Sequence, residues 1–200
     1  MDITHIIAFN LALLAALVSP GPAMICAMQA SLSHGRAAGT KVGLGLATIA
    51  SVWVVLALFG FDVLFEIYPW LYFGAKIVGG AYLIYIAFMM WKHASDGLHQ
   101  ESRVIRRPFV HGALINLLNP KSVLFGAAML VVIFPPGMSL PQILFVGANQ
   151  LVVESMFYAF IAFGFSTRTM AGGYLRAKKY IDRMAAMIIG ILGLRLIWSR

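Results

Sequence analysis

The sequence Ser19-Pro20-Gly21-Pro22 interrupts a long apolar run near the N-terminus, and Asn119-Pro120-Lys121 interrupts a second one. Proline has no N–H and clashes with the carbonyl four residues earlier, so Pro20 frees the carbonyl of Ala16 and Pro120 frees that of Asn116. In hydrocarbon, broken backbone is tolerated only where it is buried in protein or lines a watery cavity. Two such breaks, at matching places in two halves of one chain, predict a transport site.

The composition predicts an integral membrane protein without a soluble domain. Of 200 residues, 61% are hydrophobic and 11% are charged, whereas soluble domains are about half apolar and about a quarter charged. The net charge of +8 does not indicate a nucleic-acid partner, because the basic residues lie in short segments between apolar runs. Cys26 is the single cysteine, which excludes an internal disulfide. No basic segment precedes the first apolar run, so we expect a retained span rather than a cleaved signal peptide.

Six apolar runs approach the roughly 20 residues that a bilayer-spanning helix needs. They are residues 4–32, 40–61, 67–91, 109–134, 141–165 and 181–198, the last being the shortest. We therefore predict an all-α integral membrane protein with six transmembrane helices. Three helices in each half make the halves antiparallel, which is the pattern of two inverted three-helix repeats with broken first and fourth helices. The predicted divisions are repeat 1 over about 1–92, a cytoplasmic linker over about 93–107 and repeat 2 over about 108–200.

Basic residues predict the orientation in the membrane. Eleven of the fifteen lie in alternate connections: Arg36, Lys41, Lys92, Arg103, Arg106, Arg107, Arg168, Arg176, Lys178, Lys179 and Arg183. The other two connections, 62–66 and 134–140, carry none. The positive-inside rule then places both termini on the non-cytoplasmic side of a bacterial inner membrane.

Four motifs occur in order along the chain: Ser-Pro-Gly-Pro at 19–22, glycines from Gly35 to Gly45, Lys-Ile-Val-Gly-Gly-Ala-Tyr-Leu at 76–83, and Gly112 followed by Asn-Leu-Leu-Asn-Pro-Lys at 116–121. With these motifs the chain resembles the LysE/RhtB superfamily of bacterial amino-acid exporters over nearly its whole length. The resemblance implies efflux of amino acids or close derivatives from the cytoplasm, driven by the proton motive force. It leaves the particular substrate and the oligomeric state, including a homo-oligomer, open.

The first break has the features of an anion site. Ser19 suits an N-cap and proline suits the first helical turn, so an inner half-helix is expected to start between Pro20 and Pro22. Its N–H groups would receive a substrate carboxylate, while the freed carbonyls would receive an ammonium. The alternative is a structural kink whose carbonyls are satisfied by neighbouring helices.

The fourth and fifth predicted spans supply the remaining candidate site residues. Asn116 and Asn119 share one side of their helix, and Pro120 and Lys121 follow at mid-span. Gln150, Glu154 and Tyr158 recur every four residues, which places them on one helical face. Charged groups are rare in membrane spans and often functional, so we predict substrate contacts from these residues, with Glu154 and Lys76 in proton coupling. The alternatives are a hinge with Lys121 reaching an interface, and a Glu154 salt bridge to Lys76 or Lys121 that only locks helices.

The sequence indicates a carrier rather than an enzyme. It contains no Gly-x-Ser-x-Gly or Walker-type loop, the histidines lack metal-ligand spacing, and we expect no cofactor. Protons, a small amino-acid substrate and the lipid bilayer are the expected partners. A small-ion or metal-ion permease is the alternative, using the freed carbonyls and Glu154 as an ion site. A packing subunit without transport activity is a further alternative, disfavoured by the intramembrane charges.

Overall fold

The computed structural model describes residues 1–18, 22–68, 70–92, 94–95, 105–119, 122, 133–135, 137–164 and 168–198. Within these ranges, the side chains of 22, 61–66, 71–73, 75–76, 168–172, 174–175 and 196 are outside the description. The described part is helical, as the composition predicts, and contains no strand. Its helices are α1 (Ile3–Val18), α2 (Pro22–His34), α3 (Arg36–Ile67), α4 (Trp70–Lys92), α5 (Pro108–Leu117), α7 (Leu140–Gly164) and α8 (Arg168–Trp198).

Two of the helices, α3 and α7, are each long and apolar enough to cross a bilayer. They match the predicted spans 40–61 and 141–165. Within the described residues, α1 and α2 pass the same test only as a pair, bent by 59° between them. The helix thus ends and restarts around the predicted break, whose residues 19–21 lie outside the described ranges. Gly35, with a φ of 82°, alone separates α2 from α3, and this left-handed conformation is one that glycine adopts readily.

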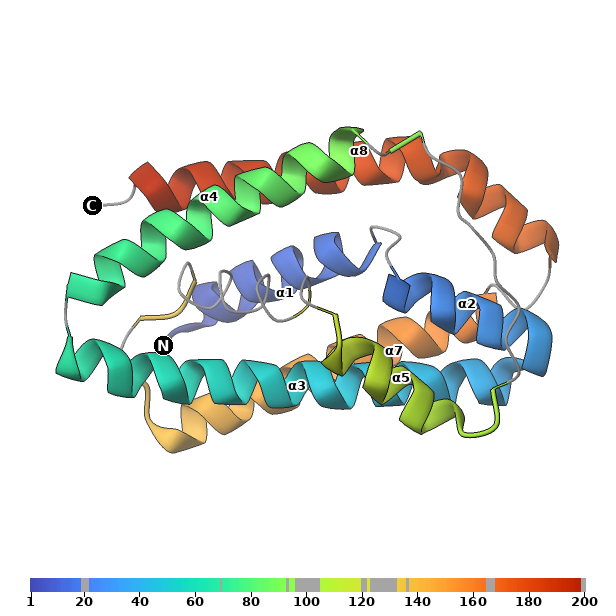
Figure 1. Cartoon of the computed structure of the whole chain (residues 1–200), viewed down its shortest axis with the longest axis horizontal. Coiled ribbons are helices and arrows are strands. Elements are labelled where there is room, and N and C mark those ends of the chain that lie inside the picture. Colours follow the sequence, from blue (N-terminus) through green and yellow to red (C-terminus); the bar gives the residue numbers. More distant parts are fainter. Residues whose placement is uncertain are drawn as a thin grey trace.

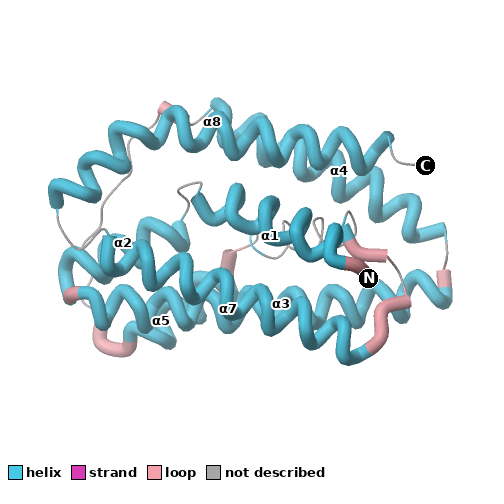
Figure 2. The backbone as a smooth tube through the Cα atoms, turned by 180° about the vertical axis from the view of Figure 1, so that it is seen from behind, coloured by secondary structure: helices cyan, strands magenta, loops and turns pink. Residues whose placement is uncertain are grey.

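The helices α3 and α7 pack antiparallel along their length (Figures 1 and 2). A Cβ on Gly43 would lie 2.2 Å from the Cβ of Tyr158, so the two backbones approach closely there. Further along, the Ser51 hydroxyl donates to the Gly147 carbonyl at 2.7 Å. Small residues allow such close approach between membrane helices, and this contact fixes which face of α7 is turned inward.

A second antiparallel pair is formed by α4 and α8, which lie side by side in both views (Figures 1 and 2). They cross at Gly80 and Gly193, where an added Cβ on either glycine would lie 2.9 Å from the other's carbonyl oxygen. The contact is thus reciprocal. Beyond the crossing, Lys178 on α8 reaches the Ala94 carbonyl just after α4.

The length of the last helix corrects the sequence interpretation. Residues 181–198 were predicted as the shortest span, preceded by a basic turn, whereas α8 begins at Arg168 and has 31 residues. Residues 168–183 contain three arginines, two lysines and two alanines and lack proline, so they can continue the helix although two glycines lie among them. The predicted turn is therefore helical, and its basic residues lie on α8.

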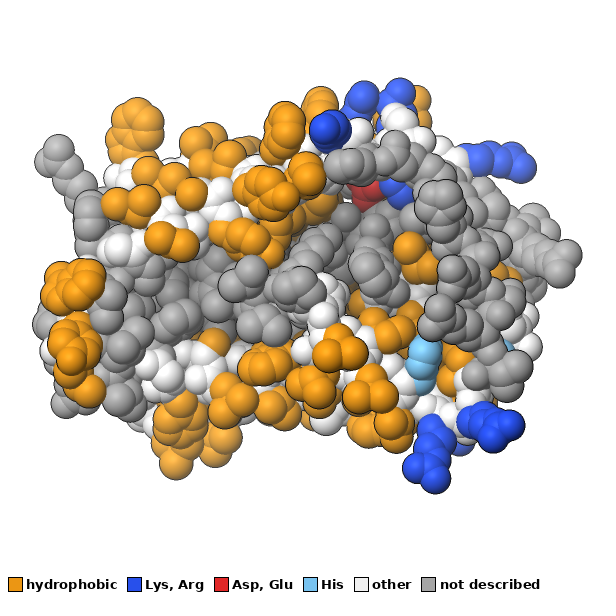
Figure 3. Space-filling model, in the orientation of Figure 1, with side chains coloured by type: hydrophobic (Ala, Val, Ile, Leu, Met, Phe, Trp, Pro, Cys, Tyr) orange, Lys and Arg blue, Asp and Glu red, His pale blue; other side chains and the backbone are white. Residues whose placement is uncertain are grey.

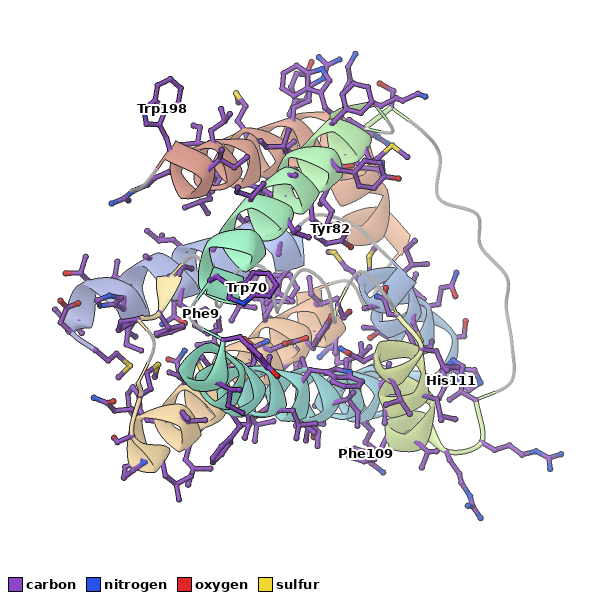
Figure 4. All side chains as sticks on the ribbon, turned by 60° about the vertical axis from the view of Figure 1, so that its left-hand side comes forward. Phe9, Trp70, Tyr82, Phe109, His111 and Trp198 are labelled. Atoms are coloured by element: carbon purple, nitrogen blue, oxygen red, sulfur yellow. The ribbon has the colours of Figure 1, made fainter. Side chains whose placement is uncertain are left out.

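Lipid-compatible surface covers much of the molecule. Large apolar side chains such as Leu11, Met156 and Phe160 are exposed, and Figure 4 shows Trp198 and Phe109 pointing away from the bundle. The visible Lys and Arg side chains gather towards one end of the long axis (Figure 3), whereas both termini lie at the opposite end (Figure 1). Apolar flanks with the basic side chains gathered towards one end are typical of a multi-pass membrane protein.

Candidate functional site

The polar stripe predicted on the fifth span is buried inside the bundle. Gln150, Glu154 and Tyr158 lie on one face of α7, with exposed fractions of 5%, 3% and 3%. An isolated buried carboxylate is strongly disfavoured, and such a group requires a partner or a proton. Burial of this stripe is therefore energetically costly in a helix that is otherwise mostly apolar.

The carboxylate of Glu154 accepts a hydrogen bond from Nε2 of Gln150, one helical turn away. This is the partner that the structure describes for Glu154. The sequence had offered Lys76 or Lys121 instead; the side chain of Lys76 and all of Lys121 lie outside the described residues. The other polar atom of this amide, Gln150 Oε1, is buried and has no hydrogen-bond partner in the described part of the chain.

One end of the stripe, Tyr158, packs against the helix that follows the first break. Tyr158 packs in one apolar cluster with Met24, Cys26 and Ala27 of α2, and it lies beside both Glu154 and Cys26. Since α2 begins at Pro22, these contacts lie within the first two turns of the half-helix. Ser19, Pro20 and Gly21 lie outside the described residues, as does the side chain of Pro22.

The fourth predicted span contributes Asn116. Its Nδ2 donates to the Leu46 carbonyl of α3 at 3.0 Å, while Oδ1 is buried without a partner among the described residues. Leu46 lies between Gly43, opposite Tyr158, and Ser51, opposite Gly147. Asn116 therefore reaches α3 at the depth of the α7 stripe, although no direct contact between Asn116 and the stripe is described.

Asn119 ends the described part of this segment. It is half-buried, and its backbone N–H donates to the Asn116 carbonyl at 3.1 Å. The helix α5 thus stops at Leu117, directly before the predicted second break. Pro120 and Lys121 lie outside the described residues.

Sequence reasoning missed an amide pair between α1 and α7. Asn149 Nδ2 donates to Asn10 Oδ1 at 2.7 Å, and Asn10 Nδ2 donates to Asn149 Oδ1 at 3.3 Å. The pair lies on the other side of the first break from α2, next in sequence to Gln150. A lone asparagine within the apolar first run was the available signal, but its partner is 139 residues away.

A buried ion pair on α8 was also missed. Lys178 Nζ lies 2.9 Å from Asp182 Oδ2, and both side chains are less than a tenth exposed. Lys178 also donates to the Ala94 carbonyl at 3.3 Å, and the Arg183 guanidinium lies 5.0 Å from the centre of the Trp91 ring. These contacts join α8 to the end of α4. The Lys–Asp spacing of four residues was the signal, hidden because the segment was interpreted as a turn.

Helices with lipid-compatible flanks, glycine-mediated crossings and a buried polar stripe behind a helix break define a membrane transport protein rather than a soluble fold. The family comparison agrees, since the model for the LysE type translocator matches residues 14–200. The chain belongs to this family.

Individual relatives match over nearly their whole lengths. The threonine efflux protein of Escherichia coli strain K12 is 28% identical, covering 92% of this chain and 93% of the relative. An uncharacterized membrane protein of Haemophilus influenzae is 26% identical, covering 92% of this chain and 91% of the relative. No solved structure matches the chain.

Proposed function

We propose that the protein exports amino acids or close derivatives from the cytoplasm in exchange for protons. The observation that carries this proposal is the buried Gln150–Glu154–Tyr158 stripe, whose Tyr158 packs against the half-helix beginning at Pro22. A buried carboxylate and the N–H groups of a helix start would suit the opposite charges of an amino-acid zwitterion. The family membership and a relative named as a threonine efflux protein support the same substrate class.

We propose the six-helix inverted repeat as the framework of this carrier, divided at about 1–92, 93–107 and 108–200. In such a repeat, the second helices of the two halves are equivalent, and so are the third helices. The antiparallel packing of α3 with α7, and of α4 with α8, supports this arrangement. The reciprocal contact of Gly80 and Gly193 is also what a two-fold axis between equivalent helices would produce.

The proposed orientation places the basic end of the molecule in the cytoplasm of a bacterial cell and both termini outside it. The segment α2 then belongs to the inner half of the first span and α1 to the outer half. In this arrangement Asn10 and Asn149 hold the outer side of the site together, while α2 and α5 border its inner side.

In the proposed mechanism, Glu154 carries the exchanged proton. The break at Ser19, Pro20, Gly21 and Pro22 exposes the N–H groups of the first turn of α2, which receive the substrate carboxylate, with Lys121 as an additional cation. Asn116, Asn119 and Tyr158 line the path, and Pro120 provides the second helix break. Lys76 is proposed to balance the charge of Glu154 during the cycle.

Counterflow in liposomes containing purified protein tests this function. Vesicles loaded with unlabelled L-threonine, or with other single amino acids in parallel, should accumulate the labelled form of a transported substrate. Reversing the direction of an imposed pH gradient should reverse the direction of net amino-acid flux. Absence of counterflow for every proteinogenic amino acid would contradict the proposal.

A small-ion or metal-ion permease is the second candidate. Asn116 Oδ1 and Gln150 Oε1 have no hydrogen-bond partner among the described residues, and with the Glu154 carboxylate they are acceptors that would also suit a cation. Flux of Na⁺, K⁺, Mn²⁺ and Zn²⁺ through the same vesicles distinguishes the two. Metal flux without amino-acid counterflow would favour the permease.

A further inference from the structure

We propose that the substrate's ammonium group and the exchanged proton compete for one place, between the Glu154 carboxylate and Gln150 Oε1. This inference rests on the proposed function and specifies how exchange is coupled. It starts from Gln150 Oε1, a buried acceptor that has no donor among the described residues. The same side chain is hydrogen-bonded to the buried Glu154 carboxylate.

The hydrogen-bonding pattern of Gln150 defines what can fill this place. The amide donates from Nε2 to Oε2 of Glu154, so the side chain's donor faces the carboxylate and its acceptor is unused. The second carboxylate oxygen is likewise an acceptor when Glu154 is ionised. The missing ligand must therefore be a donor.

A proton satisfies both groups at once. With Glu154 protonated, its O–H can donate to Gln150 Oε1 while Gln150 Nε2 continues to donate to Glu154. This gives a cyclic acid–amide pair and leaves no buried charge. A primary ammonium satisfies the same acceptors differently, because its three hydrogens can bridge the carboxylate and Oε1 while its charge neutralises Glu154.

The two ligands exclude each other electrostatically. Either one alone leaves the Glu154 site neutral, whereas both together leave it positive and neither leaves it negative. Uncompensated charge is strongly disfavoured in a buried site. Substrate arriving from the cytoplasm would therefore release the proton to cytoplasmic water, and a proton arriving from outside would release the substrate.

Few other titratable groups face Glu154 from the packed helices. Tyr158 lies next to it on α7, and Cys26 faces the stripe from α2. Asn10 on α1 is uncharged. Arg36 of α3 stacks on Phe163, 5.5 Å from its ring centre and more than two turns along α7 from Glu154. Lys76 and Lys121, whose side chains lie outside the described residues, are the basic groups that the sequence offered as partners for Glu154.

Proton release on substrate binding tests the competition. Purified protein in weakly buffered detergent, with a pH-indicator dye, is titrated with whichever amino acid gives counterflow, starting with L-threonine. Wild-type protein should release close to one proton per molecule bound at pH values where Glu154 is protonated, and the apparent Kd should rise about tenfold per pH unit lowered in that range. Glu154→Gln should release none.

The chemical nature of the ligand gives a second readout. The N-acetyl and N,N,N-trimethyl forms of the same amino acid keep the carboxylate but cannot supply a primary ammonium. They should bind at least tenfold more weakly to wild-type protein. Gln150→Met keeps the apolar bulk but removes the acceptor, and should raise the Kd of the amino acid roughly tenfold.

Ser155→Ala is the matched control. It removes another buried oxygen that has no partner among the described residues. Ser155 follows Glu154 directly and therefore points about 100° around the helix from it, so Ser155→Ala should leave Kd and proton release unchanged. An amino acid that shows counterflow but binds without proton release, with a pH-independent Kd, would overturn the competition while the exporter function stands. Absence of both counterflow and binding across the panel would overturn both.

Discussion

The close packing of α5 against α3 predicts how strongly a methyl group added at Gly112 destabilises the protein. A Cβ added to Gly112 would lie 2.0 Å from the Val42 carbonyl oxygen, whereas ordinary contacts begin near 3.4 Å. In Gly112→Ala the two backbones must therefore separate by about 1.4 Å. Overpacking of this kind costs about 1–3 kcal/mol.

The same displacement would break the hydrogen bond from Asn116 to the Leu46 carbonyl, now 3.0 Å long. Leaving that buried donor unsatisfied costs about 1–3 kcal/mol more. Taken together, the two effects should make Gly112→Ala less stable than the wild type by about 2–6 kcal/mol. Export should also be impaired, because Asn116 would no longer lie at the same depth as the α7 stripe.

Thermal unfolding of purified protein in one detergent, followed by tryptophan fluorescence, measures the effect. Gly74→Ala on α4 is the matched control: outside its own helix backbone, no heavy atom of the described residues lies within 4 Å of the added Cβ. Helix propensity alone should therefore make it neutral or stabilising by up to about 1 kcal/mol. If Gly112→Ala unfolds at the wild-type temperature and exports normally, the close packing described here does not position the site.

Three further predictions concern other parts of the molecule. Asp182→Asn should destabilise the protein by about 3 kcal/mol because it breaks a buried ion pair, and adding Lys178→Met should recover part of the loss; equal stability of the single variant in thermal unfolding would contradict this. Pro22→Ala should leave membrane abundance unchanged but reduce export, since it favours a continuous first helix, and wild-type export would show the break to be dispensable. With Cys26→Ser as background, a membrane-impermeant maleimide applied to intact cells should label Ser139→Cys and spare Ser102→Cys; the reverse pattern would invert the proposed orientation.

Local patterns in the sequence predicted the helical class, the spans now seen as α3 and α7, and the shared face of Gln150, Glu154 and Tyr158. These features depend on hydrophobicity and on the helical period, which are properties of contiguous residues. The interruption between α1 and α2 was predicted for the same reason, since proline acts on its own helix.

Features that depend on tertiary contacts were not predictable in this way. The sequence could not pair Asn10 with Asn149, because either asparagine could equally have met a backbone carbonyl or a watery cavity. The extent of α8 was misjudged because hydropathy marks where a helix can meet lipid, not where the helix begins. The burial of Lys178 and Asp182 likewise arises from packing against the end of α4.

Glu154 is proposed to carry the proton that drives export, and an uphill-transport assay tests this role. Wild-type and Glu154→Gln proteins are reconstituted in parallel, preloaded with equal concentrations of a labelled amino acid on both sides, and given a pH gradient. The wild type should build a substrate gradient opposite to the proton gradient and lose it on addition of a protonophore, whereas Glu154→Gln should build none while retaining some binding or exchange. A substrate gradient of wild-type size in Glu154→Gln would show that the proton is carried elsewhere.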